Sequence, residues 1–325
     1  MAGVREWAGR TVVVTGGLGF IGSHFVEELA ARGAEVICLH RSRNEEMIRV
    51  LPDVGHTQLV QLDLSEAAAL SALFRRTTAQ IDAVFHCAAM DGSAQFKTRH
   101  SAEILEANIR MNLNVLSAAR DHGVRTVVLL SSAEVRSMLG CGGYPERPLF
   151  ASLPGGGYVL SKMFTEISAD LFREQFGMNI LIARPTNVYG PRDNLGCSGR
   201  VIPSMLRQAI SGQKIEIWGN GTQTRDFIYV TDLVRATLQM VATNKYTIFD
   251  VGNGDSVSIL ELGQTLFSVL GLPERIQLHP AKPAGVACEP ADLSRLREVI
   301  DFTPLSLREG LNRMVRCYQT EASSR

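Results

Sequence analysis

The sequence predicts an α/β fold, a doubly wound parallel sheet with helices on both faces, followed by a smaller C-terminal α/β lobe. Apolar β-type runs alternate with helical patterns over the first 184 of the 325 residues, beginning with a βαβ unit whose strands are residues 11–14 and 36–39. Beyond residue 184 this alternation breaks into shorter elements. We therefore expect one domain over residues 1–184 and a second over residues 185–325, with the chain free to cross between them.

The first βαβ unit contains a glycine-rich turn. Residues 11–22 read TVVVTGGLGFIG, so Gly16, Gly19 and Gly22 follow the strand, and Phe20 and Ile21 open the helix. Glycines at this spacing allow a tight turn, close approach of a pyrophosphate to the main chain, and close packing of the helix on the strand. The helix N-terminus favours an anion. Because a strand precedes the glycines and a helix follows them, the pattern indicates a dinucleotide site rather than an ordinary turn.

The end of the second strand bears on which dinucleotide binds. An acid there would bind the ribose 2′-hydroxyl and repel a 2′-phosphate. The chain instead has His40, Arg41, Ser42 and Arg43, which favours NADP, with NAD as the second possibility. The alternative is a solvated basic turn.

Two more strands are predicted at residues 59–64 and 81–89. Ligands of parallel sheets bind at the carboxyl ends of the strands, so Asp63 and Leu64 are expected near the adenine. The small residues Ala88 and Ala89 would let the dinucleotide lie close. Alternatively, Asp63 caps the helix that follows.

A fifth strand, residues 124–130, ends in Ser131 and Ser132, and a later helix carries Tyr158 and Lys162. The i,i+4 spacing places both polar groups on one helix face. A free tyrosine has a pKa of about 10, so a base at neutral pH needs a fall of about three units, which the Lys162 charge and an oxidised nicotinamide can supply. The phenolate would take a hydroxyl proton while the carbon loses hydride, and Ser132 would bind the oxygen; in reverse, the trio reduces a ketone. Taken singly, Tyr158 and Lys162 also fit an exposed helix face, and Ser132 also fits a cap at the end of a strand.

The remaining elements complete the expected order. A helix is predicted over about 103–122, a mobile loop over 136–157 and a sixth strand over 179–183. The second domain should contain strands 215–218, 225–230 and 247–251, and a helix from about residue 232. Capping boxes at Ser258 with Glu261 and Ser306 with Glu309 predict two later helices. The two domains are expected to share one interface with a cleft.

Composition limits the possible partners. The 33 acidic and 33 basic residues balance, and the sequence has no lysine- or arginine-rich run. Both observations argue against nucleic acid as the main partner. The six cysteines show no C-x-x-C spacing, so we expect reduced thiols, and no metal site is expected. Neither a signal peptide nor an apolar run of membrane-spanning length is present, which predicts a cytoplasmic protein.

The motifs together resemble the extended short-chain dehydrogenases/reductases of the nucleotide-sugar epimerase/dehydratase group. Nearly the whole chain takes part, with the matching segments in the order TGGLGFIGSH, DL at Asp63, HCAA at His86, Asn108, SSAEV, YVLSK, RPTNVYGPR and GNGTQTRDFIYVTD. The resemblance implies a Rossmann domain that binds NAD(P), with Asn108 and Pro185 among its cofactor residues. It also implies a C-terminal lobe that binds a nucleoside-diphosphate sugar, and a homodimer through helices 103–122 and 158–176.

The resemblance also assigns substrate contacts. Asn187 and Arg225 match positions that hold the diphosphate, although Arg225 could instead pair with a surface acid such as Asp226. Glu134 matches an acid that acts on the sugar ring in dehydratases and decarboxylases, or is a solvated acid.

Some positions depart from the family pattern. Ala133 occupies the place of the dehydratase acid and cannot donate a proton, Arg136 replaces a tyrosine, and Cys288 stands where an arginine often binds the nucleotide. The segments ANIRMNLNVL and PTNVYGPRDN also resemble relatives of GDP-fucose synthase, which carry cysteine and histidine where this chain has Glu134 and Arg200. Arg200 resembles the group's decarboxylases.

The leading hypothesis from these residues is an epimerase that forms a transient ketosugar, most often at C4. Alternatives are a 4-ketosugar reductase that consumes NADPH, and a decarboxylase or dehydratase that uses Glu134. From another class comes a non-catalytic NADP-sensing regulator, which would need the glycines but not Ser132, Tyr158 and Lys162.

Overall fold

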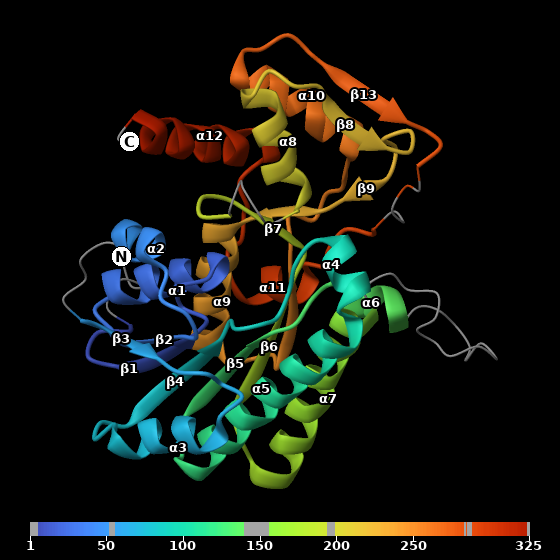
Figure 1. Cartoon of the computed structure of the whole chain (residues 1–325). Helices are drawn as coiled ribbons and strands as arrows, with labels where there is room; N and C mark the ends of the chain where they lie inside the picture. Colours follow the sequence, from blue (N-terminus) through green and yellow to red (C-terminus); the bar gives the residue numbers. More distant parts are fainter. Residues whose placement is uncertain are drawn as a thin grey trace. The chain divides into compact units, whose positions relative to one another are not determined.

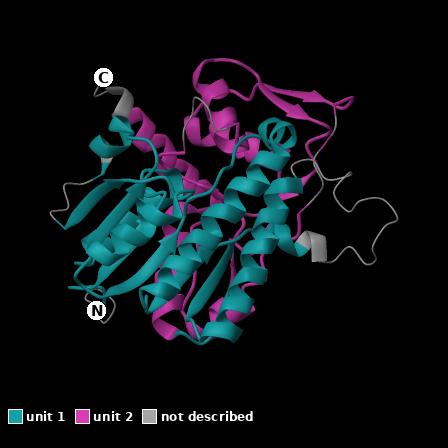
Figure 2. Ribbon diagram, turned by 60° about the horizontal axis from the view of Figure 1, so that its bottom comes forward, with its two compact units in different colours: residues 1–184, 244–248 teal, residues 185–243, 249–325 magenta. Residues whose placement is uncertain are grey.

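A computed structural model describes residues 6–51, 56–139, 156–193, 199–282, 284 and 288–323. The chain forms two compact units, coloured separately in Figure 2. The first comprises Met1–Arg184 and Asn244–Ile248, and the second comprises Pro185–Thr243 and Phe249–Arg325. The chain therefore passes from the first unit to the second after Arg184 and returns briefly before continuing in the second.

The central sheet is parallel and, in the described part of the chain, has seven strands. Their spatial order is β11 (Ile248–Val251), β6 (Ile180–Pro185), β5 (Thr126–Leu130), β4 (Ile81–His86), β1 (Thr11–Thr15), β2 (Glu35–His40) and β3 (Thr57–Gln61). Strand β1 pairs in parallel with both β2 and β4. The strand order reverses at β1, and such a switch point is where sheets of this kind bind ligands. The predicted fold class is confirmed.

Helices cover both faces of the sheet (Figure 1). The helices of the first unit are α1 (Phe20–Ala31), α2 (Glu45–Val50), α3 (Ala67–Arg76), α4 (Ala94–Arg99), α5 (Ser101–Asp121), α6 (Glu134–Leu139) and α7 (Gly156–Phe176). Neighbouring residues of a strand point to opposite faces. On β4, Val84 packs with Leu70 of α3 and Val115 of α5, whereas the Phe85 ring lies 5.1 Å from the Phe25 ring of α1. The nearly continuous apolar strands are therefore buried on both sides, as parallel strands require.

The second unit has short paired strands and longer helices. Its elements besides β11 are β7 (Asn187–Tyr189), α8 (Val201–Ile210), β8 (Ile215–Trp218), β9 (Thr224–Arg225), β10 (Phe227–Tyr229), α9 (Val230–Thr243), β12 (Val257–Ser258), α10 (Ile259–Leu270), β13 (Ile276–His279), α11 (Ser294–Val299) and α12 (Leu307–Ser323). Strand β10 pairs with β7 and β13 with β8 in parallel, and β12 pairs with β9 antiparallel.

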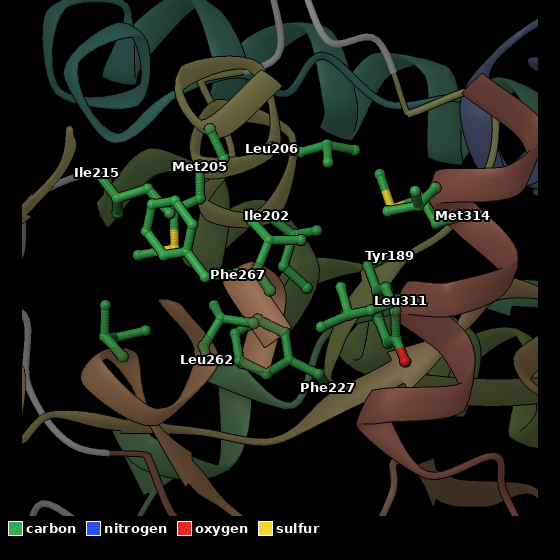
Figure 3. Close-up of a cluster of buried hydrophobic side chains, with 14 of the residues drawn as sticks. Tyr189, Ile202, Met205, Leu206, Ile215, Phe227, Leu262, Phe267, Leu311 and Met314 are labelled. Atoms are coloured by element: carbon green, nitrogen blue, oxygen red, sulfur yellow. The ribbon is translucent and has the colours of Figure 1, made fainter. Parts of the chain in front are cut away.

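The core of the second unit joins α8, α10 and α12 (Figure 3). Apolar side chains at helical spacing meet there, and these include Ile202 and Leu206, Leu262 and Leu266, and Leu311 and Met314. Both predicted caps are confirmed. The Glu261 N–H donates to Ser258 Oγ at 3.1 Å, and the Glu309 N–H donates to Ser306 Oγ at 3.3 Å.

Several predicted boundaries were wrong. Strand β4 ends at His86, so Ala88 and Ala89 lie in the following loop, and β3 ends at Gln61, before Asp63 and Leu64. The predicted strand 225–230 is broken at Asp226, whose carboxylate accepts main-chain N–H groups from elsewhere in the unit. Residues 136–139 of the predicted loop continue α6, and 156–157 begin α7; the rest lies outside the described residues.

Cys38, Cys87, Cys288 and Cys317 are free thiols, as predicted, while Cys141 and Cys197 lie outside the described residues. Among the helices that the structure describes, none has the length and apolar composition needed to span a membrane.

Candidate functional site

The glycine-rich turn between β1 and α1 leaves no room for side chains. Gly16 has a φ of +64°, and a Cβ there would lie 2.8 Å from the Ala88 Cα. A Cβ on Gly22 would lie 2.2 Å from the main-chain oxygen of Gly16. Gly19 is the N-cap of α1 and has no side chain with which to satisfy the first helical N–H groups, those of Phe20 and Ile21. The turn thus fits a dinucleotide, because bare main chain and a helix N-terminus can hold its pyrophosphate.

Thr15 fixes the loop that lies against this turn. Its Oγ1 is 2.8 Å from His86 Nδ1 and accepts a 3.2 Å hydrogen bond from the Ala88 N–H. Burial lowers the pKa of His86 to about 3, so the ring is neutral and Nδ1 can accept the threonine proton. The small residues Ala88 and Ala89 are therefore held at the carboxyl end of β4, although they lie outside the strand.

The residues after β2 divide into a buried and an exposed part. The side chain of His40 is buried, which lowers its pKa, whereas Arg41, Ser42 and Arg43 are exposed. Arg43 forms an ion pair with Glu45. Arg41 has no ion pair of this kind among the described residues; its charge acts on the Asp63 carboxyl, and its exposed guanidinium can face a ligand phosphate.

Asp63 stabilises the turn after β3. Its Oδ1 accepts a 2.9 Å hydrogen bond from the Ser65 N–H, and this bond lowers the pKa of the carboxyl, with a smaller contribution from Arg41. Asp63 therefore caps the turn ahead of α3 rather than α3 itself, whose N-cap is Glu66. Leu64 beside it is buried.

Lys162 and Tyr158 lie on one face of α7, as their spacing predicts. The Lys162 side chain is buried, its Nζ donates a 2.7 Å hydrogen bond to the Leu130 oxygen at the end of β5, and it lies 5.7 Å from the Tyr158 ring centroid. Burial lowers the pKa of Lys162 to about 8; Asp91 and Cys87 oppose this fall and Lys97 adds to it. The ammonium is thus mostly charged at neutral pH and lies beside the phenol, an arrangement suited to proton transfer.

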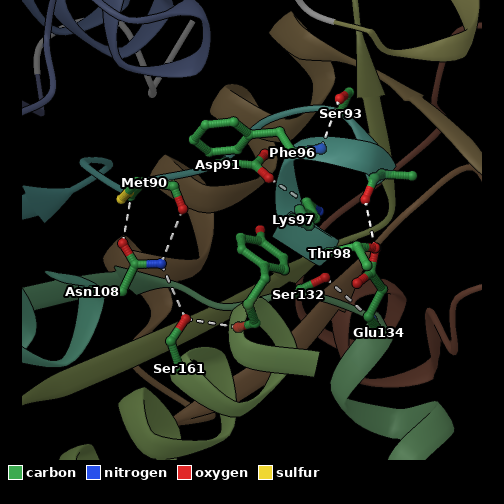
Figure 4. Close-up of polar contacts among 12 residues, drawn as sticks. Met90, Asp91, Ser93, Phe96, Lys97, Thr98, Asn108, Ser132, Glu134 and Ser161 are labelled. Carbon is green, nitrogen blue, oxygen red and sulfur yellow. Dashed lines mark hydrogen bonds and ion pairs between the residues drawn. The ribbon is translucent and has the colours of Figure 1, made fainter. Parts of the chain in front are cut away.

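Ser132 is the second residue after β5 and is buried, while Glu134 at the start of α6 is exposed. The Glu134 N–H donates a 3.2 Å hydrogen bond to Ser132 Oγ, drawn in Figure 4. This bond occupies one acceptor position of the hydroxyl and leaves its proton for another partner.

Asn108 of α5 joins the loop after β4 to α7 (Figure 4). Its Oδ1 accepts from the Met90 N–H at 2.7 Å, and its Nδ2 donates to the Met90 oxygen and to Ser161 Oγ, both at 3.1 Å. Ser161 Oγ in turn donates to the main-chain oxygen of Tyr158 at 2.7 Å. The amide is thus engaged within the protein, and it positions the segment that carries Tyr158.

Two charged groups near Tyr158 were missed by the sequence analysis. Lys97 of α4 places its Nζ 3.7 Å from the centroid of the Tyr158 ring and 3.0 Å from Asp91 Oδ1. Both side chains are mostly buried. Helix α4 has only six residues and shows no motif, so no sequence signal indicated this contact.

A buried network also fixes α7 to the sheet. Ser131 Oγ donates to Glu166 Oε1 at 2.5 Å, and Arg184 Nε donates to the same oxygen at 2.8 Å. The second carboxylate oxygen receives Arg184 Nη2 at 2.5 Å. Glu166 on α7 is therefore tied to the ends of β5 and β6, next to Ser132. The sequence signal was the i,i+4 spacing of Lys162 and Glu166, which places Glu166 on the same face of α7 as Lys162.

In the second unit, Asn187 lies on β7, which pairs with β10, and Arg225 lies on β9, which pairs with β12. Asn187 pairs with Phe227, and its Nδ2 donates to the Asp226 oxygen at 3.1 Å. Arg225 is half-buried on β9, with Nη1 donating to the Thr224 oxygen at 2.7 Å. Pro185 is the buried last residue of β6.

Arg200 lies elsewhere in this unit, at the N-cap of α8. Its Nη1 forms a 2.9 Å ion pair with Oδ1 of the buried Asp193. Part of the guanidinium is therefore already bound within the second unit. The main-chain oxygen of Cys288 accepts from the Thr224 and Ser256 hydroxyl groups at 3.4 and 3.3 Å, which places Cys288 beside β9.

Trp218, at the end of β8, was also missed. Its side chain is 52% exposed, and Lys282 Nζ lies 5.1 Å from its ring centroid. A large exposed aromatic side chain next to a cation offers a surface on which a planar ring can stack. The sequence signal was a tryptophan in an otherwise alternating strand, IEIW.

Comparisons with known proteins find relatives that match nearly the whole chain. A dTDP-4-dehydro-6-deoxy-D-allose reductase from Streptomyces sp is 50% identical over 318 residues, covering 97% of this chain and 98% of that protein. A reductase of the same name from Streptomyces bikiniensis is 48% identical with the same coverage. The crystal structure of UDP-glucose 4-epimerase from Thermotoga maritima with UDP-glucose matches with a TM-score of 0.82 and 25% identity, covering 96% of this chain and 99% of that chain.

The family model for the NAD dependent epimerase/dehydratase family matches residues 12–252. The resemblance inferred from the motifs is thereby confirmed. The chain belongs to the NAD dependent epimerase/dehydratase family and is an extended short-chain dehydrogenase/reductase, a class of enzymes that use NAD(P) on nucleotide sugars.

Proposed function

We propose that this enzyme reduces the ketone of a nucleoside-diphosphate 4-ketosugar to an alcohol, with dTDP-4-dehydro-6-deoxy-D-allose as the first substrate to test. The observation that carries the proposal is that two relatives covering 97% of the chain, at 50% and 48% identity, bear the name of this reductase. The epimerase hypothesis relies on the same chemistry, since both reactions reduce a ketosugar. A reductase differs from an epimerase because it receives the ketone from another enzyme. Ala133 supports this hypothesis, because it stands where a dehydratase would have the acid needed to make the ketosugar itself.

The residues of the first unit have complementary roles in this proposal. NADPH, when bound, supplies the hydride that reaches the sugar carbon. Tyr158 donates its phenolic proton to the ketone oxygen, and Ser132 donates a hydrogen bond to that oxygen. The charged Lys162, 5.7 Å from the Tyr158 ring centroid, stabilises the phenolate that remains until a solvent proton replaces the one transferred. Glu134 has no step in this reduction and would face solvent or the sugar.

We assign the NADPH preference to the turn after β2. No acid ends that strand, and the exposed Arg41 and Ser42 can bind a 2′-phosphate. The glycine turn and the residues after β3 and β4 would hold the rest of the cofactor, from residues Gly16, Gly19, Phe20, Ile21, Gly22, Asp63, Leu64, Ala88 and Ala89.

We assign nucleotide-sugar binding to the second unit. Arg225 and Asn187 would hold the diphosphate, because a guanidinium makes charge-assisted hydrogen bonds to phosphate. The exposed Trp218 ring would stack on the nucleotide base. Arg200 would place its positive charge near the sugar, and a contact with the sugar would then replace part of its ion pair with Asp193.

We also propose a homodimer through α5 and α7. Ile167 and Leu171 of α7 are 53% and 57% exposed and lie one helical turn apart, so they form an apolar strip that a second copy would cover. Light scattering during size-exclusion chromatography measures the mass directly. A dimer has twice the 35.5 kDa of one chain, and a species of 35.5 kDa alone would contradict the assignment.

The test of the main proposal uses purified enzyme, the dTDP-4-ketosugar and NADPH. Absorbance at 340 nm should fall in proportion to product, whose mass should exceed that of the ketosugar by two hydrogens. Conversion without absorbance change to a product of equal mass would favour the epimerase, and carbon dioxide release from a sugar acid would favour the decarboxylase. Cofactor binding with no turnover of any nucleotide sugar would favour the regulatory protein.

A further inference from the structure

The Tyr158 ring is in contact with a second cation that belongs to no recognised motif. Lys97 Nζ lies 3.7 Å from the ring centroid, against 5.7 Å for Lys162 Nζ. The Lys162 ammonium also donates to the Leu130 oxygen, so part of its charge is engaged by the end of β5. The lysine predicted from the sequence is therefore the more distant of the two.

The position of Lys97 is supported on several sides. Its Nζ pairs with Asp91 Oδ1 at 3.0 Å, and the exposed fractions of the two side chains are 18% and 24% (Figure 4). Ser93 caps α4 by accepting the Phe96 N–H at 3.1 Å. Asn108 binds both main-chain groups of Met90, the residue just before Asp91. A lysine held in this way loses little further side-chain freedom when it acts on the ring.

We propose that Lys97, held by Asp91, is a positioning residue that acts on Tyr158 by favouring the phenolate over the phenol and by fixing the orientation of the ring. The inference deepens the proposed function, since it rests on Tyr158 being the acid. A cation over an aromatic face is attracted to the ring electrons, and the attraction grows when the ring carries a full negative charge. Lys97 therefore stabilises the product of proton donation more than its reactant.

Other ionisable groups lie on the helix that carries Tyr158 and on the neighbouring elements of the first unit. Lys162 lies on the same helix, His86 ends β4 and Cys87 follows it, Glu134 lies at the start of α6, and the hydrogen-bonded His100 and Glu103 lie at the start of α5. His86 is neutral, and Asp91 is the negative partner of Lys97. Lys97 is the cation in contact with the ring face, so we expect its removal to favour the neutral phenol.

The direct test is a tyrosinate titration at 295 nm. The difference between wild type and Tyr158→Phe isolates this phenol from the other five tyrosines. The experiment is run on the protein alone and with saturating NADP, with circular dichroism to confirm that the fold is intact at each pH. We expect Lys97→Met to raise the apparent pKa of Tyr158 by about one unit, and Lys97→Arg to restore most of the shift. Lys97→Gln serves as a second neutral variant should Lys97→Met fold poorly.

Kinetics provide the second measurement. Reduction needs the protonated phenol, so kcat/KM falls as pH rises through the pKa of Tyr158. Lys97→Met should move this fall to higher pH by about one unit and lower the plateau about threefold, because a weaker acid donates more slowly. A raised KM with an unchanged titration would make Lys97 a substrate ligand and overturn the proposal. Lower thermal stability with an unchanged titration would overturn it too. Failure to reduce any ketosugar, with the titration shifted as expected, would reject the proposed function and leave this inference standing.

Discussion

The ammonium group of Lys162 lies 2.7 Å from the main-chain oxygen of Leu130. This bond joins the helix that carries Tyr158 to the end of the strand that is followed by Ser132. A lysine at this position therefore has two effects. It positions α7 on the sheet, and it places a buried charge beside the phenol.

Removal of the phenolic hydroxyl should abolish reduction. We expect Tyr158→Phe to lower kcat by at least about 1000-fold, because the proton donor is lost, and to change the Kd for NADPH by less than about threefold. Consumption of NADPH at 340 nm and quenching of protein fluorescence measure the two quantities. Tyr318→Phe is the matched control, since that hydroxyl donates to the Asp193 oxygen in the second unit. Near wild-type turnover by Tyr158→Phe would reject its role.

The buried charge of Lys162 should reduce stability at neutral pH. Its pKa of about 8 in the folded state lies below the unfolded value of 10.5. Below pH 8 the buried charge therefore lowers the free energy of unfolding, and this destabilisation disappears as the pH rises toward 10.5. We expect Lys162→Met to be nearly inactive. Its free energy of unfolding relative to wild type should fall by about 2 kcal/mol between pH 6.5 and 9.5, because only wild type gains stability with pH. Urea unfolding at both pH values measures this, and a constant difference would contradict it.

Arg41 should decide the cofactor preference. We expect Arg41→Asp to raise KM for NADPH about 10- to 100-fold, through loss of a charge-assisted hydrogen bond and repulsion of the 2′-phosphate, and to leave KM for NADH equal or lower. Arg43→Ala is the control, because Arg43 forms an ion pair with Glu45. Equal effects of Arg41→Asp on both cofactors would argue for a solvated turn.

Glu166 should stabilise the region around the site. Its carboxylate receives Ser131 and Arg184, and truncation leaves a largely buried guanidinium without its partner. We expect Glu166→Ala to lower the free energy of unfolding by about 3 kcal/mol. Glu106→Ala removes an exposed pair with Arg110 on α5 and should cost less than about 1 kcal/mol. Similar losses in the two variants would show that the buried network contributes little.

Trp218 should matter for the nucleotide and not for the fold. We expect Trp218→Ala to raise KM for the ketosugar nucleotide about 10-fold, since base stacking is worth about 1–3 kcal/mol, with little change in Tm because the ring is half exposed. Leu272→Ala, at another exposed apolar residue of the second unit, should leave KM unchanged. An unaltered KM in Trp218→Ala would place the base elsewhere.

The sequence by itself determined the fold class, the glycine turn and the family. Each of these depends on local patterns: alternating apolar runs, glycines at fixed spacing, and Tyr158 one helical turn before Lys162. Strand ends were predicted less well, because Asp63, Ala88 and Ala89 lie just past strands whose apolar runs do not mark where pairing stops.

Only the tertiary structure decided how the surrounding groups are used. The lysine nearest to Tyr158 is Lys97, 61 positions earlier in the chain, and it comes from a six-residue helix without periodicity. Asn108 is engaged by Met90 and Ser161, and Glu166 by Ser131 and Arg184. These contacts join residues far apart in the chain, and they exist because the sheet order places the ends of β4, β5 and β6 side by side, which no local pattern encodes.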